Sequence, residues 1–169
     1  MLCAPDGVTV PLTRDDNPSV ETAQQALVAF LRDEVGPALR RLGLRGSGTA
    51  YLLPDDRFWL VVGFQRSTSS NREALRFTVN LTVASRAGWD AARRSNPWIG
   101  ARPSGNSGYA VRGLVEFVRI GSLLPVPQDT WWEIRPGRST GVLIDELMAV
   151  IATAGLPWLR SHGASDLIE

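Results

Sequence analysis

The chain has 169 residues, 44% hydrophobic and 21% charged, which is the composition of a folded domain and excludes a largely disordered chain. A net charge of +1 at pH 7 is too small for a general nucleic-acid binder, so no nucleic-acid partner is expected. All 18 basic residues are arginine, which excludes Schiff-base lysines and phosphate-binding loops that depend on a lysine.

The N-terminal region and the cysteine usage predict a cytoplasmic protein. Cys3 is the single cysteine, so no internal disulfide can form, and the first residues lack the basic and apolar regions of a signal peptide. No apolar run approaches the ~20 residues that span a bilayer, so no membrane association is expected. We expect one domain over residues 1–169, with 1–16 as an N-terminal segment.

A long amphipathic helix is predicted near the N-terminus. Asn17-Pro18 is a favourable start, because asparagine caps helices and proline suits the first helical position. Apolar residues then recur every three or four positions up to Leu42, and Gly43 is a favourable stop. Gly36-Pro37 predicts a kink or break within this helix.

The middle of the chain is predicted to form strands. A turn at 45–48 precedes a hairpin of strands 49–53 and 57–66, joined by Pro54-Asp55-Asp56. Residues 75–84 alternate apolar and polar side chains, which indicates a further strand. The remaining expected elements are a helix over 87–94, a long flexible loop over 95–113, strands at 114–120 and 131–134, a helix from Ser139 or Thr140 to Ala154 ended by Gly155, and a short helix beginning at Leu156.

These elements predict an α+β fold. The connections between strands are mostly too short for parallel crossovers, so the sheet should be largely antiparallel. We expect four or five strands, with the N-terminal and C-terminal helices packed on one face.

The sequence lacks the residues of common catalytic sites. The only histidine, His162, lies near the C-terminus, where it is more typical of a solvated or capping residue than of a catalytic one. One histidine and one cysteine cannot form a structural zinc site. We therefore expect no catalytic residues, no metal and no cofactor, and favour a protein that is not an enzyme.

Polar side chains within the predicted strands form one candidate site. Gln65, Asn80 and Arg119 form a cluster if neighbouring strands turn them to the same face. Arg119 would then anchor an acidic group, because a guanidinium binds a carboxylate with two hydrogen bonds. The alternative is a solvated sheet face with a single Glu–Arg pair.

Aromatic residues form the other candidate contacts. Adjacent Trp131 and Trp132 must point to opposite faces of a strand, and Trp132 is taken as a contact residue. Trp98 and Tyr109 flank Arg102 in the 95–113 loop, and aromatics with Ser, Gly and Asn are typical of antibody-like contact loops. The alternative interpretations are pure packing for the tryptophans and a surface insertion without a role for the loop.

Five short motifs follow one another in a fixed order: Phe64-Gln-Arg, Phe77-Thr-Val-Asn-Leu, Arg119-Ile-Gly-Ser-Leu, Asp129-Thr-Trp-Trp and Leu156-Pro-Trp-Leu. This order resembles a bacterial family known only as a domain of unknown function (family 4304). The resemblance covers roughly residues 20–160, and the long Gly/Ser/Pro loop and the residues before Arg119 depart from the family pattern. It implies the same α+β fold, no particular activity, and attention to Gln65, Asn80, Arg119 and Asp129.

Three functions are compatible with these patterns. The favoured one is a small intracellular binding protein, such as an immunity or adaptor protein, that engages a partner protein through the sheet face or the 95–113 loop. The second is a hydrolase or transferase that uses Asp129, Glu133 or Glu116 as acid or base with Arg119 holding an anion. The third is a small-ligand-binding domain lined by Trp59, Trp131 and Phe64.

Overall fold

The structure, a computed structural model, describes residues 21–105, 107 and 113–164. Within these residues six strands form one antiparallel sheet in the order β1-β2-β3-β4-β5, and β6 pairs with β4 beyond the end of β5. The predicted α+β class is therefore confirmed, although the sheet has more strands than the four or five expected. The strands are β1 Arg45–Ser47, β2 Ala50–Leu53, β3 Phe58–Arg66, β4 Leu75–Ser85, β5 Glu116–Arg119 and β6 Trp132–Ile134.

The N-terminal helix starts later than predicted and passes through its proline. Thr22 is the N-cap of α1 (Ala23–Phe30) and forms a reciprocal capping box with Gln25, whereas Asn17 and Pro18 lie outside the described residues. A π-helical turn at Leu31–Val35 connects α1 without a break to α2 (Gly36–Arg41). Of the kink or break predicted at Gly36-Pro37, the break is wrong, because the helix continues to Arg41. The departure from a regular α-helix is the wider turn directly before Gly36, which accommodates a ring that cannot donate a backbone hydrogen bond.

The C-terminal helix also contains a π-helical turn before a proline. Helix α5 (Gly141–Val150), a π-helical turn at Ile151–Gly155 and α6 (Leu156–Ala164) form one rod, in which Pro157 follows the widened turn. The prediction that Gly155 ends the helix is wrong. A Cβ at Gly155 would lie 3.2 Å from Ile120 Cδ1, so this glycine permits close contact between the rod and the sheet instead.

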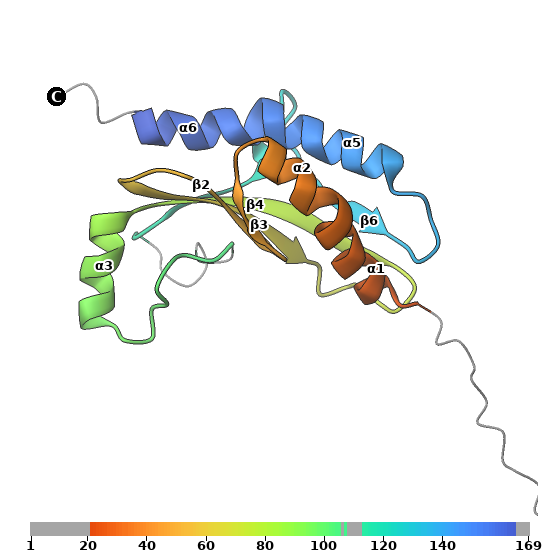
Figure 1. The fold of residues 1–169 in the computed structure, drawn as a ribbon, viewed down its shortest axis with the longest axis horizontal. Coiled ribbons are helices and arrows are strands. Elements are labelled where there is room, and N and C mark those ends of the chain that lie inside the picture. The colour runs from red at the N-terminus through yellow and green to blue at the C-terminus, as the bar shows by residue number, and fades with distance from the viewer. Residues whose placement is uncertain (1–20, 106, 108–112, 165–169) are drawn as a thin grey trace, which may run out of the picture.

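Both rods cover the same face of the sheet, as Figure 1 shows with α1–α2 in orange and α5–α6 in blue. The core lies between them and the odd-numbered residues of β4, and its members are almost fully buried. They include Leu27, Val35, Leu39, Phe77, Val79, Leu81, Leu147, Ile151 and Leu159.

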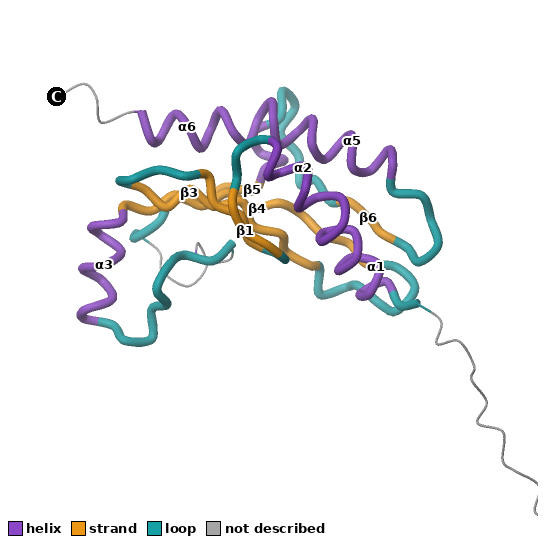
Figure 2. The backbone as a smooth tube through the Cα atoms, in the orientation of Figure 1, coloured by secondary structure: helices purple, strands orange, loops and turns teal. Residues whose placement is uncertain are grey.

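The opposite face of the sheet, called the second face below, is covered by a shorter helix and the segment that follows it. Helix α3 (Arg86–Ser95) lies on this side in Figures 1 and 2, capped by Ser85. Trp89 and Ile99 pack there against Ala84 and form a second, smaller cluster. Gly105 lies so close to Gly63 of β3 that a Cβ on Gly63 would meet its Cα at 2.2 Å.

Two sequence expectations change at the level of single elements. The expected turn at 45–48 is the short strand β1 with Gly48 in the left-handed conformation, since a glycine there lets the chain reverse into β2. Residues Gly141–His162 are long and apolar enough to cross a membrane by length and composition. Leu147, Ile151 and Leu159 of this helix are fully buried, and 28% of its most apolar window is buried.

Candidate functional site

A row of buried polar residues lies on the second face of β4. Thr78, Asn80 and Thr82 alternate with the apolar core residues and each has no exposed surface. The interpretation of this row as a solvated face is therefore wrong, and Gly105 lies against Gly63, the cross-strand neighbour of Asn80. Buried polar groups require hydrogen-bond partners, and these partners determine what the face can do.

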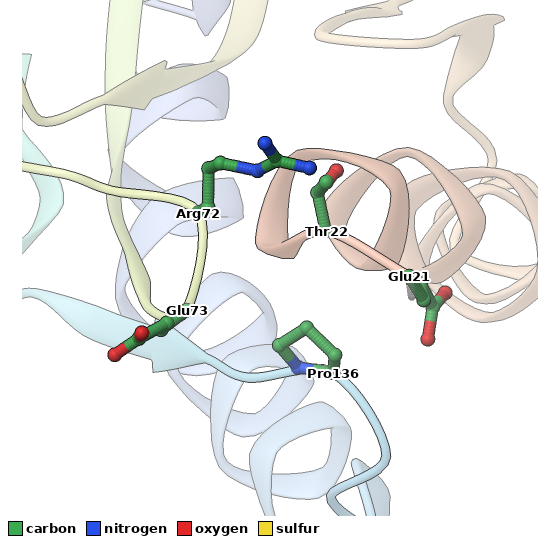
Figure 3. Close-up of a pocket in the computed structure, with 5 residues that line it drawn as sticks. All are labelled: Glu21, Thr22, Arg72, Glu73 and Pro136. Carbon is green, nitrogen blue, oxygen red and sulfur yellow. The ribbon is translucent and has the colours of Figure 1, made fainter. Parts of the chain in front are cut away.

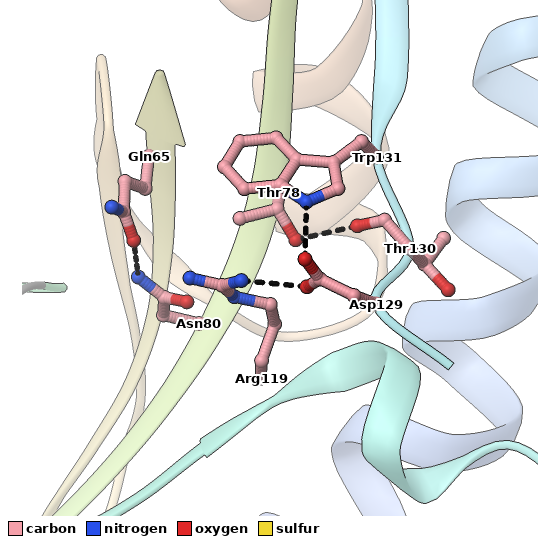
Figure 4. A network of polar contacts seen from close by, with 7 residues as sticks. All are labelled: Gln65, Thr78, Asn80, Arg119, Asp129, Thr130 and Trp131. Carbon is pink, nitrogen blue, oxygen red and sulfur yellow. Dashed lines mark hydrogen bonds and ion pairs between the residues drawn. The ribbon is translucent and has the colours of Figure 1, made fainter. Parts of the chain in front are cut away.

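The strand register brings the predicted cluster together. Asn80 lies directly opposite Arg119 of β5 and Gly63 of β3, and Gln65 lies opposite Thr78. Asn80 Nδ2 donates a 2.7 Å hydrogen bond to Gln65 Oε1, and Thr78 Oγ1 donates a 2.8 Å bond to the carbonyl oxygen of Thr130 (Figure 4). Through these two bonds β4 is joined to Gln65 of β3 and to Thr130, which lies just before β6.

Residues 120–131 leave the sheet between β5 and β6 and return to the same edge of β4. The neck of this excursion is closed at Gly121, whose carbonyl oxygen accepts a 3.0 Å hydrogen bond from the Gln128 backbone. A Cβ at Gly121 would lie 2.1 Å from Gln128 O and 2.6 Å from Thr130 Oγ1, so only glycine fits. The motifs at Arg119 and Asp129, ten residues apart, therefore meet in space.

Four residues form a surface at this neck, which we call the Trp131 platform: Arg76, Arg119, Asp129 and Trp131. Arg119 donates a 2.6 Å bond from one terminal nitrogen to Asp129 Oδ1, and Trp131 Nε1 donates a 2.8 Å bond to Asp129 Oδ2 (Figure 4). The guanidinium carbons of Arg119 and Arg76 lie 5.0 and 5.9 Å from the centre of the Trp131 ring. These are cation–π distances, so the indole is held by its edge and by two cations.

The platform holds Asp129 as an anion. The hydrogen bond from Trp131, followed by that from Arg119, lowers the pKa of Asp129 below its ordinary value. Both carboxylate oxygens accept a hydrogen bond, and a general acid or base near neutral pH needs a pKa shifted the other way. Asp129 therefore orients its neighbours and is unsuited to proton transfer.

The other two carboxylates considered for catalysis lie elsewhere. Glu116 pairs with Val83 on the helix-covered face, where its Oε2 lies 2.7 Å from His162 Nε2 of α6. Arg119 is on the second face, so the hypothesis that places Glu116 and Arg119 in one pocket is wrong. Glu133 is bonded to Arg135 at 2.6 Å.

The tryptophans divide between core and surface. Trp132 is 4% exposed, stacks on Phe77 with ring centres 6.0 Å apart, and donates a 3.2 Å bond to Glu146. Its assignment as a contact residue is therefore wrong, and Trp131, half-buried on the other face, takes that position. The alternation in Trp132-Glu133-Ile134 is the signal that places Trp132 with apolar Ile134 in the core.

The set proposed for a small-ligand pocket is also separated. Phe64 belongs to the core under the helices, whereas Trp59 packs against the second cluster and stacks with Arg86 at 3.8 Å. Trp59 and Trp131 share a face but pair with opposite ends of β4, at Ala84 and next to Phe77. These three side chains do not line one cavity.

The 95–113 segment is described in part. Trp98 is 67% exposed and Arg102 is also exposed, as a contact loop requires. Tyr109 lies outside the described residues. Ile99, Gly105 and Ser107 are buried against the sheet, so this part of the segment is anchored.

A cavity of about 470 Å³ opens between the start of α1 and the loop before β4 (Figure 3). Glu21, Thr22, Arg72, Glu73 and Pro136 line it, and none of them comes from the polar row or the Trp131 platform. Glu21 is the first described residue, and this cavity borders the undescribed segment 1–20. We therefore assign no site to it.

Comparison with known proteins gives one match. The family model described as "Domain of unknown function (DUF4304)" matches residues 35–161, about three quarters of the chain. The match spans the polar row, Gly121 and the Trp131 platform. No curated protein and no solved structure matches.

Proposed function

The chain belongs to the DUF4304 family, a domain of unknown function, and from the geometry of the Trp131 platform we propose that it is a binding domain for a partner protein. The observation that carries the proposal is a half-buried indole on the second face of the sheet, held in place by Asp129, Arg119 and Arg76. Tryptophan and arginine dominate the energetics of protein interfaces. Holding them in one conformation reduces the entropy lost on binding.

The chemistry of the site favours binding over catalysis. The carboxylate of Asp129 is committed to two hydrogen bonds, Glu116 faces the helices, and Glu133 is paired with Arg135. Each of the three carboxylates named in the hydrolase or transferase hypothesis thus has a partner among the described residues. An immunity protein or an adaptor needs only a stable contact surface, and we propose such a role inside the cell.

The proposal is tested by affinity capture of the tagged full chain in the organism that encodes it, followed by reconstitution with the purified partner. We expect one stoichiometric partner, and Trp131→Ala should raise its Kd roughly 30-fold or more, as for an interface hot spot. Thermal unfolding of the variant checks that the fold persists. Capture of no partner, or a partner with unchanged affinity for Trp131→Ala, would contradict the proposal.

The matched control is Trp98→Ala, because Trp98 is the most exposed described tryptophan and lies on the loop rather than the platform. If the loop is the contact surface instead, this variant and Tyr109→Ala lose the partner while Trp131→Ala retains it. Partner activity then separates the two roles: an immunity protein abolishes it, whereas an adaptor leaves it intact.

A further inference from the structure

Arg76 differs from the other arginine of the platform. It is exposed on the second face of β4, and its guanidinium forms no hydrogen bond or ion pair with any described residue. Its cross-strand neighbour Glu133 is bonded to Arg135, and Asp129 is bonded to Arg119. Three arginines therefore lie beside two carboxylates. Arg76 forms an ion pair with neither, although its charge contributes to the lowered pKa of Asp129.

The contact with Trp131 leaves the donors of Arg76 accessible. Arg76 is exposed and its guanidinium carbon lies 5.9 Å from the ring centre, so its N–H groups can meet an acceptor. The edge of a guanidinium matches a carboxylate, which accepts two parallel hydrogen bonds. The half-buried indole beside it offers apolar surface to neighbouring groups.

The surrounding charges select the kind of anion. Asp129 is 62% exposed in its side chain and Glu133 is 41% exposed, so both repel additional negative charge near Arg76. This repulsion disfavours a phosphate group or a nucleic-acid backbone and is weaker for a single carboxylate. Charge complementarity at this point therefore fits one acidic side chain of a protein.

We infer that the Trp131 platform binds an acidic segment of the partner, with one side-chain carboxylate on Arg76 and an adjacent apolar residue on Trp131. This inference rests on the proposed function and specifies the chemistry that the partner presents. The carboxylate gains two charge-assisted hydrogen bonds, and the apolar residue covers the indole. Arg119 and Asp129 keep the ring in place without contacting the acidic group.

Titration of the full chain with short capped peptides tests the inference, followed by NMR of the Trp131 indole N–H and the Arg76 Nε–H. One peptide carries glutamate between two leucines, a second carries glutamine there, and a third carries phosphoserine. We expect the glutamate peptide to shift both signals and to bind roughly tenfold more tightly than the glutamine peptide. Arg76→Gln should abolish that preference, whereas Arg45→Gln, on the opposite edge of the sheet, should retain it.

Three results would overturn the inference: equal binding of the glutamate and glutamine peptides, a preference unchanged by Arg76→Gln, or tighter binding of the phosphoserine peptide. If one of these results is found while a captured partner still requires Trp131 for binding, the acidic-segment inference is rejected and the proposed binding function is retained. Failure to capture a partner rejects the proposed function itself.

Discussion

Over residues 77–82 the two faces of β4 are buried to the same extent and are chemically opposite. Phe77, Val79 and Leu81 face the helical rods, and Thr78 and Asn80 lie on the second face, yet all of them have no exposed surface. The apolar face is stabilised by packing that depends on volume. The polar face is stabilised by directed bonds to Gln65 and to the 120–131 excursion. Burial alone therefore does not identify an apolar core, and the specific side-chain hydrogen bonds of β4 lie on its polar face.

The largest effect expected from this comparison is at Phe77. Its ring contacts Phe30, Phe64 and Trp132, with centres 6.0 to 6.3 Å apart, so Phe77→Ala should lower the free energy of unfolding by about 4 kcal/mol. Its neighbour provides the matched change, because Thr78→Val keeps the volume and removes only the bond to Thr130 O, for about 1 kcal/mol. Urea unfolding of both variants measures the difference, and equal losses would show that the two faces are stabilised in the same way.

An intermediate effect is expected at Gly121. The Cβ of Gly121→Ala would overlap Gln128 O and Thr130, so the excursion must move, at a cost of about 2 kcal/mol, and the Trp131 indole signal should shift. Gly141→Ala is the control, since its Cβ meets nothing closer than 3.9 Å at the start of α5, where alanine is neutral or slightly stabilising. An unchanged Trp131 signal in Gly121→Ala would mean that the neck does not position the platform.

The smallest effect is a pH dependence confined to acid. Because the folded-state pKa of Asp129 lies below the unfolded value of about 3.9, its stabilisation is complete above that pH and is lost as the pH falls through the folded-state pKa. The Trp131 indole N–H signal should therefore stay constant from neutral pH to about 4 and move only below it. Asp129→Asn should shift the signal at every pH and remove the acid transition. A midpoint above that of ordinary aspartate would contradict the assignment of both hydrogen bonds.

Local patterns predicted most of the fold and part of the site. Alternation identified β4 and turn residues identified the β2–β3 hairpin, whereas the approach of Gln65, Asn80 and Arg119 could be stated only as a condition, because the sequence does not give the register that brings them together. The burial of Asn80 was not predictable in this way, since its cover comes from residues about twenty-five positions further along the chain. The link between Glu116 and His162 likewise depends on tertiary packing of α6.

The Trp131 platform was likewise predictable only in part from the sequence. Asp129 and Arg119 stand out through their motifs, whereas Arg76 draws no attention as one of many arginines on a strand. Its role depends on Trp131, and that residue becomes visible only when strand parity assigns Trp132 to the core. The rules for helix ends also misled at Pro37 and Gly155, because they describe a regular α-helix and omit the wider π-helical turn, whereas the helix expected from Leu156 is present as α6.

Those two widened turns explain a spacing in the rods. Ala23, Leu27, Leu31, Val35 and Leu39 are all buried, as are Leu147, Ile151, Gly155 and Leu159, and each series advances by four residues at every step. On an ideal α-helix each such step overshoots a full turn by about 40°, so the stripe would rotate off the sheet within a few steps. The extra residue in each π-helical turn rotates the buried stripe back toward the sheet. A four-residue repeat of buried positions that continues past a proline thus indicates a helix with a π-helical turn, whose buried stripe stays in contact with the sheet.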